Sequence, residues 1–250
     1  MMNVFNFLKG SKVIDVTHTV DEIENAAYNE LKSLGFKRYG RTLHRFVSDD
    51  ISQVINFQSG MPTKGMSGLL CVNIGIRVPE CVDRIFQPIS EKKKYYHEYE
   101  CNIRSRLGTV NGKKEEWYDL RKDTKKMLTK IIAEIKETIP VFDVLCERQA
   151  ILDHRKEYPL FDTTNRHMVL LEEAMIYGHF EDKNKAKMLF EEYYQSAVDE
   201  YNNQMKNGTK HYLKKGERIV YMEKDITTVK DGYITVYGAS YGHIEYLNDL

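Results

Sequence analysis

The sequence predicts an α+β fold in which an antiparallel sheet is covered on one face by helices. Segments with strand character follow one another without an intervening helix, at residues 42–47, 51–58 and 69–78. Amphipathic helical patterns lie before and after them, at 20–34 and 117–137. Strands and helices therefore do not alternate as they would around a parallel sheet, and an antiparallel arrangement is expected.

Each strand is predicted from its alternation and from the residues that end it. Residues 42–47 turn through the polar triplet SDD into 51–58, which is typical of a hairpin. A loop rich in Gly, Pro and Ser leads to 69–78, and Pro79 ends that strand because proline cannot donate to a sheet. A fourth strand is predicted over 95–110.

The helices are predicted from their caps and apolar stripes. Thr19 and Glu22 have the spacing of a capping box, and Gly35 is a natural stop because glycine readily takes the left-handed conformation that ends a helix. The second helix, 117–137, has apolar residues at helical spacing. Pro140 is expected to interrupt it.

The remainder of the chain changes character. Residues 145–208 are a helical segment, with two helices joined near Gly178, and an Asp-Gly turn at 231–232 predicts a C-terminal β-hairpin. The predicted organisation is therefore an α+β domain at 1–144, a helical segment at 145–208 and a hairpin segment at 209–250. The hairpin could pack on the first domain.

Composition excludes several classes of protein. Lys+Arg and Asp+Glu are both 37, and this zero net charge disfavours nucleic acid as a partner. The four cysteines are far apart, which indicates free thiols in a reducing cytoplasm rather than a zinc site. The longest apolar run falls far short of the ~20 residues of a membrane span, so no membrane partner is expected. The histidines form no H-E-x-x-H motif, and neither a metal nor another cofactor is expected.

Polar residues gather on one face of the predicted sheet. Side chains alternate across a strand, so Leu70, Ile74 and Ile76 share an apolar face while other residues point the opposite way. The candidate binding residues on that opposite face are His44, Asn56, Gln58, Asn73 and Arg77, joined by Arg104 and Arg106 from the fourth strand.

Two interpretations of these residues stay open. Amide side chains donate and accept hydrogen bonds, and arginines suit carboxylate or phosphate, so the face could bind a ligand or a partner. The solvated-sheet interpretation is that this is simply the water-facing side of a one-sided sheet. His44 would then lie at the strand surface, and Arg104 and Arg106 would pair with acids such as Glu115 and Glu116. The pattern alone favours the solvated-sheet interpretation.

Several short motifs along the first 140 residues carry a family resemblance. In order, LKSLGFKRYGRTLHRF, QVINFQ, VNIGI and CNIRSRLG…EEWYDL resemble the bacterial domain of unknown function 4304 (DUF4304) family. The resemblance implies a cytosolic-type α+β domain without an assigned reaction. The positions that it singles out are Gly35, Phe36, Asn56, Gln58, Asn73, Gly75, Arg104, Arg106 and Trp117. Trp117 followed by Tyr118 departs from the tryptophan-rich pair expected there.

No nucleophile, phosphate-loop or paired-carboxylate motif is recognised, so the sequence favours a binding protein over an enzyme. The leading hypothesis is a cytosolic protein-interaction module, whose roles could include neutralising or sensing another protein in bacterial conflict. The alternative is a small-ligand or nucleotide-handling enzyme that uses the polar face, with Arg104 and Arg106 taking an anion. A pocket of ~300–1,000 Å³ with converging side chains would favour a small anionic ligand, and a flat face would favour a protein partner.

Overall fold

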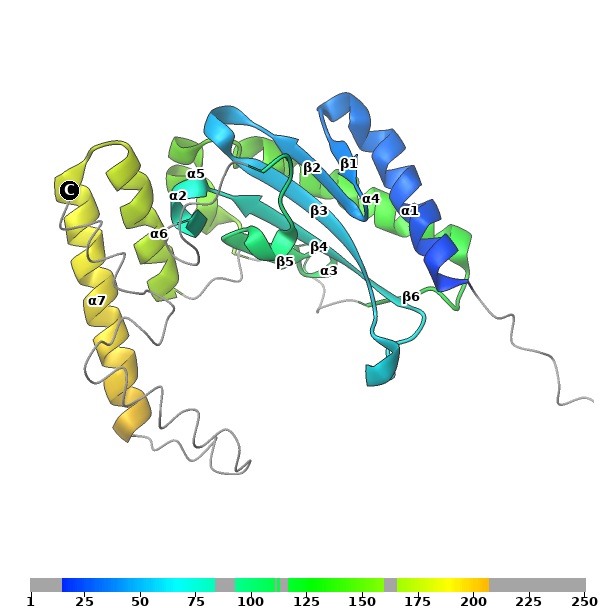
Figure 1. Cartoon of the computed structure of the whole chain (residues 1–250). Helices are drawn as coiled ribbons and strands as arrows, with labels where there is room; N and C mark the ends of the chain where they lie inside the picture. Colours follow the sequence, from blue (N-terminus) through cyan, green and yellow to red (C-terminus); the bar gives the residue numbers. More distant parts are fainter. Residues whose placement is uncertain (1–14, 84–92, 111, 113–116, 160–165, 207–250) are drawn as a thin grey trace, which may run out of the picture.

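A computed structural model describes residues 15–83, 93–110, 112, 117–159 and 166–206 (Figure 1). Its centre is a sheet in which every pairing is antiparallel. The strands are β1 (Lys37–Tyr39), β2 (Thr42–Phe46), β3 (Ser52–Ser59), β4 (Leu69–Arg77) and β5 (Ile103–Arg106) in that spatial order, with β6 (Tyr118–Asp119) also paired to β4. The predicted α+β class with an antiparallel sheet is confirmed.

Two long helices cover one face of this sheet. α1 (Val16–Leu31) and α4 (Thr124–Val144) contact each other, and α1 also contacts β3 (Figure 1). Against them β4 buries its apolar row completely, and that row consists of Leu70, Val72, Ile74, Ile76 and Val78. Gln53 is a buried polar residue on this face, and its amide donates to the backbone carbonyl of Phe142 at 2.5 Å, which ties α4 to β3.

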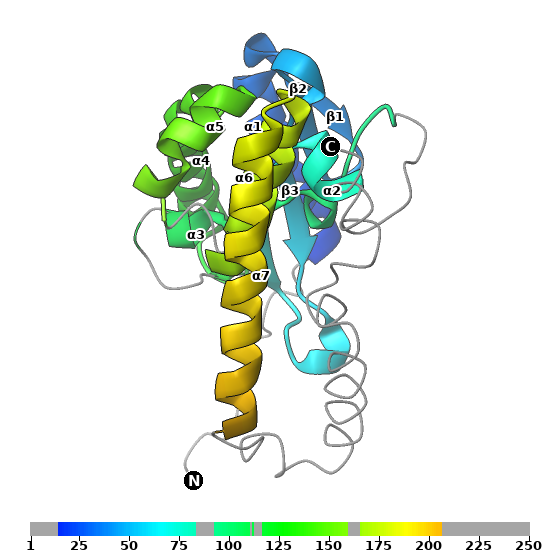
Figure 2. The same cartoon turned by 90° about the vertical axis from the view of Figure 1, so that its left-hand side faces the viewer.

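Shorter helices complete the described part of the chain. The α-helices are α2 (Pro79–Asp83), α3 (Leu107–Val110), α5 (Arg148–His154), α6 (Arg166–His179) and α7 (Lys183–Lys206). The 3₁₀ helices are η1 (Lys32–Leu34), η2 (Ser48–Asp50), η3 (Pro62–Lys64), η4 (Glu98–Glu100) and η5 (Arg155–Glu157). α6 and α7 form the helix pair predicted around Gly178, and they stand at one end of the molecule beside α2 and α5 (Figures 1 and 2). No helix in these described ranges is both long and apolar enough to span a membrane.

The predicted fourth strand over 95–110 is wrong in extent. Only Ile103–Arg106 pairs with β4, because β4 offers it partners only from Asn73 to Ile76. Before it, the backbone turns into η4, where a carboxylate oxygen of Glu100 accepts from the backbone N–H of His97 at 2.9 Å. This local capping box replaces sheet pairing, since it satisfies a backbone donor within the segment.

The predicted helix ends also need correction. α1 begins at Val16 rather than at the Thr19 box, because Asp15 is the N-cap and accepts from His18 N at 3.1 Å. At its other end η1 follows, and Gly35 takes the predicted left-handed conformation with φ of 88°.

α4 differs from its predicted course at both ends. It begins only at Thr124, capped by Asp123, because the residues before it form β6. Pro140 lies inside the helix, which continues to Val144, so the expected interruption is wrong. Ile139 and Phe142 are buried on either side of the proline, and their packing holds the last turn although one backbone hydrogen bond is lost.

Buried ion pairs join the helical segment to the sheet. Arg148 of α5 makes two hydrogen bonds to Glu80 of α2, at 2.7 and 2.8 Å. Arg155 of η5 lies 2.6 Å from Glu172 of α6, and both side chains are only 2% exposed. Asn102 donates to Glu172 at 3.0 Å and accepts from Val78 N at 2.8 Å, so the pair is connected to the end of β4.

These contacts connect the predicted α+β domain to the predicted helical segment. The division of the chain into three segments at 144 and 208 stays a prediction. The predicted C-terminal hairpin, 209–250, lies outside the described residues.

Glu172→Gln is expected to lower the free energy of unfolding by about 3 kcal/mol, because it removes the carboxylate that lies 2.6 Å from the buried Arg155 cation. The measurement is urea unfolding followed by circular dichroism. Lys156→Gln is the matched control. Lys156 of η5 pairs with Glu173 of α6 at 3.0 Å but is exposed, so its loss should cost no more than about 0.5 kcal/mol. Equal effects of the two variants would contradict the assignment of the buried pair.

Candidate functional site

The face of the sheet opposite α1 and α4, called the polar face below, is partly covered. The cover segment, residues 93–102, includes η4, which contacts β3 and β4. It lies close because Gly75 has no side chain: a Cβ added there would be 2.8 Å from Cys101 Sγ. The solvated-sheet interpretation is therefore wrong for the middle of this face, where Asn73 is 7% and Arg77 3% exposed.

A row of hydrogen-bonded polar side chains, three amides and one hydroxyl, crosses three strands of the polar face. The sheet register pairs Thr42 with Asn56 and Asn56 with Asn73. Asn56 Nδ2 donates to Thr42 Oγ1 at 3.0 Å, and Asn73 Nδ2 donates to Gln58 Oε1 at 2.9 Å. A longer bond of 3.4 Å joins Asn73 Nδ2 to Asn56 Oδ1. The row fixes the Asn73 amide in one orientation, since its NH₂ group is held by two neighbours.

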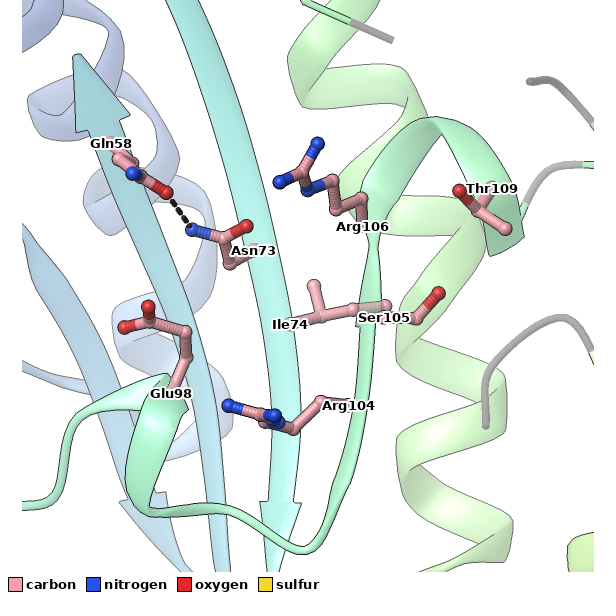
Figure 3. Close-up of a pocket in the computed structure, with 8 residues that line it drawn as sticks. All are labelled: Gln58, Asn73, Ile74, Glu98, Arg104, Ser105, Arg106 and Thr109. Atoms are coloured by element: carbon pink, nitrogen blue, oxygen red, sulfur yellow. Dashed lines mark hydrogen bonds between the residues drawn. The ribbon is translucent and has the colours of Figure 1, made fainter. Parts of the chain in front are cut away.

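The row leads into a cavity of about 410 Å³, called the candidate pocket below (Figure 3). Its lining consists of Gln58, Asn73, Ile74, Glu98, Arg104, Ser105, Arg106 and Thr109. The candidate pocket thus brings together Gln58 and Asn73 with the two arginines of β5. Its volume falls within the ~300–1,000 Å³ typical of small-molecule sites.

The arginines reach the candidate pocket because of the sheet register. Arg104 pairs with Gly75 and Arg106 with Asn73, so both point to the polar face as their spacing predicts. The guanidinium carbon of Arg106 lies 5.4 Å from the centre of the Trp117 ring. Trp117 therefore helps to orient this arginine, a role that the sequence did not reveal. Glu115 and Glu116, their expected ionic partners, lie outside the described residues.

Glu98 is a pocket residue that the sequence analysis missed. It comes from η4 and stands across the candidate pocket from Arg106 (Figure 3). Within the described part of the chain its carboxylate makes no side-chain hydrogen bond or ion pair. The one signal in the sequence is the pair His97 and Glu100, because their capping box turns the chain and directs Glu98 to the sheet.

His44 and Arg77 lie apart from the candidate pocket, beneath the cover segment. The Arg77 guanidinium carbon is 3.8 Å from the centre of the Tyr96 ring. His44 is 1% exposed, and its ring meets Phe46 edge-on at 4.5 Å, with Tyr96 at 6.1 Å. The expected place of His44 at the strand surface is therefore wrong. Asn56 is also absent from the lining, and its side-chain oxygen accepts a hydrogen bond from Asn73, which does line the pocket.

The buried position of His44 changes its acid–base behaviour. Burial is the largest cause, and the charges of Lys37 and Arg77 add to it, so that the pKa of His44 falls to about 4. His44 is thus neutral near pH 7. Its Nε2 has no hydrogen-bond partner among the described residues.

The described residues offer no metal site, and three of the four thiols are buried. They contain no group of three or more His, Cys, Asp or Glu side chains placed to hold a metal ion. All four cysteines are free, and burial raises the pKa of Cys71 to about 11. A buried thiol of this kind is protonated and unreactive at neutral pH.

A second cavity, of about 710 Å³, lies among η5, α6 and α7. Its lining mixes apolar and charged side chains of both signs and includes none of the predicted site residues. The lining therefore does not indicate one class of ligand.

Fold and site together define an antiparallel α+β protein with a polar cavity on the partly covered face of its sheet. The model of the family described as "Domain of unknown function (DUF4304)" matches residues 27–163, slightly more than half of the chain, and the chain belongs to this family. The match contains every residue of the candidate pocket and extends beyond the motifs of the first 140 residues. Comparison with curated proteins gave no match, and comparison with solved structures gave none either.

His44 predicts a pH-dependent stability. The unfolded chain binds a proton near pH 6.5 whereas the folded chain does so only near pH 4, so the free energy of unfolding should fall as the pH drops through this window. The full loss is roughly 3 kcal/mol, one pKa unit being worth about 1.4 kcal/mol. Urea unfolding at pH 7, 6, 5 and 4.5 measures it, and His44→Phe should flatten the slope.

His18→Gln is the control for this experiment, because His18 lies exposed at the start of α1. That variant should retain the slope of the unmodified protein. A His44→Phe variant with the same slope would show that another group causes the pH dependence.

Proposed function

We propose that this protein is a binding protein whose candidate pocket takes a small ligand through an anionic group. The observation that supports the proposal is the meeting of Arg104 and Arg106 in one cavity of about 410 Å³. Guanidinium groups present paired N–H donors that match carboxylate and phosphate oxygens. Two arginines from a single strand can thus hold one anion from one side.

The neutral part of the lining supports the same proposal. Gln58 and Asn73 offer donors and acceptors to the ligand without adding charge. Their mutual hydrogen bond and the contact to Asn56 hold them in place before any ligand arrives. Such preorganisation lowers the entropy lost on binding.

A protein-interaction role is a second proposal, supported by exposed aromatic side chains on the polar face and on the cover segment. Tyr99 of η4 is 65% exposed and Phe46 of β2 is 41% exposed. Aromatic residues are enriched at protein interfaces. The roles proposed with it are neutralising or sensing another protein in bacterial conflict. A cytoplasmic location belongs to both proposals, and the four free thiols support it.

The proposed anion site predicts the effect of removing the arginines. In isothermal titration, the best binder from a panel of phosphate, citrate, AMP and L-glutamate should lose about tenfold in affinity in Arg104→Gln and in Arg106→Gln. The double variant should lose about a hundredfold. The expected size reflects the ~1.5 kcal/mol of a charge-assisted hydrogen bond.

The matched control is Arg121→Gln, which removes an exposed arginine of the same chain that pairs with Asp119 outside the candidate pocket. It should leave the affinity unchanged. Absence of binding for all four anions, or unchanged affinity in the double variant, would contradict the proposed function.

A further inference from the structure

We propose that the candidate pocket selects a zwitterion, a small amino acid or related amino-carboxylate, with Glu98 taking its amine. The inference rests on the proposed function, since Arg104 and Arg106 must hold the carboxylate. It adds the opposite charge and therefore names the class of ligand.

The pocket has two walls of opposite charge that come from different parts of the chain. Both cations belong to β5, whereas the carboxylate of Glu98 belongs to η4, which lies over β3 and β4. In Figure 3 the Glu98 side chain stands on one side of the cavity and Arg106 on the other, with Asn73 between them. Burial is the largest cause of the raised pKa of the Cys71 and Cys101 thiols, and the charge of Glu98 adds a smaller contribution, which agrees with a carboxylate near the polar face of β4.

The two glutamates of η4, Glu98 and Glu100, make different contacts. Glu100 is held by the backbone N–H of His97 and by an ion pair with Lys93. Glu98, one residue before Tyr99, makes no such contact with a described residue and lines the cavity instead. The structure of η4 therefore depends on Glu100, and the charge of Glu98 remains directed at the pocket.

The lining between the charged walls is neutral. Gln58 and Asn73 are joined at 2.9 Å, and among the described residues the Asn73 carbonyl oxygen accepts only from the Cys71 thiol, a weak donor, at 3.5 Å. The arrangement fits a ligand whose two charges are separated by a few bonds.

Selectivity follows from the carboxylate wall. A ligand with only negative charge, such as a phosphate ester, would bring its charge toward Glu98 without compensation, which opposes binding. A ligand with only an amine would bring a positive charge toward the two positively charged arginines, which also opposes binding. A zwitterion satisfies both walls.

The test is isothermal titration of the full chain with the twenty common amino acids, followed by three probes built on the best binder. These are the amino acid itself, its deamino carboxylic acid and its carboxamide. The amino acid should bind at least tenfold more tightly than either analogue. Glu98→Gln should lower its affinity about tenfold and leave the affinity for the deamino acid unchanged or raised.

Glu137→Gln is the matched control, because Glu137 is exposed on α4 outside the pocket, and it should change nothing. Arg104→Gln with Arg106→Gln should lower the affinity for the amino acid and for the deamino acid alike, by about a hundredfold. If no amino acid binds, or if Glu98→Gln leaves the preference intact, the zwitterion inference is overturned. Should carboxylates or phosphate then still bind through the arginines, the proposed function survives; should no anion bind, both fail.

Discussion

The pairing of β3 with β4 is the constraint on which the rest of the structure depends. It runs over the full length of β3, and its register places Asn56 opposite Asn73 and Ile55 opposite Ile74. A slip by one residue would turn every side chain of one strand to the other face. The amides would then meet α1 and α4, and the apolar row would meet the pocket. Burial of the apolar row, at about 25 cal/mol per Å² removed from water, therefore also decides where the polar groups stand.

The polar face of the sheet has two regions of different character. Toward β5 it is open and charged, with Arg104 and Arg106 beside the amides. Toward β2 it is closed by aromatic rings, and here Arg77 and His44 serve packing rather than exposure. The cover segment packs on the closed region through Tyr96 and borders the open one through Glu98, so that one stretch of chain both covers this face and lines the cavity.

Alternation along the strands was enough to predict the two faces and to collect Gln58, Asn73, Arg104 and Arg106 on one of them. That information is local, since a period of two residues is visible in the chain itself. The closeness of Glu98 and the burial of His44 were not predictable in this way. Both depend on how the segment before β5 returns over the sheet, which is decided by contacts between residues far apart in the sequence. The course of α4 through Pro140 likewise depends on the packing of Ile139 and Phe142.

Gly75, in the middle of β4, is a position at which a single substitution could change the width of the cavity during evolution. Gly75 sets the height of the cover segment above the sheet, because Cys101 rests against its bare backbone. Cys101 follows η4 directly, and its N–H donates to the carbonyl of Glu98 at 3.1 Å. A single methyl group at this point would lift one side of the cavity and leave the strand with the arginines in place. The width of the cavity is thus governed by a residue that contributes no atom to its lining.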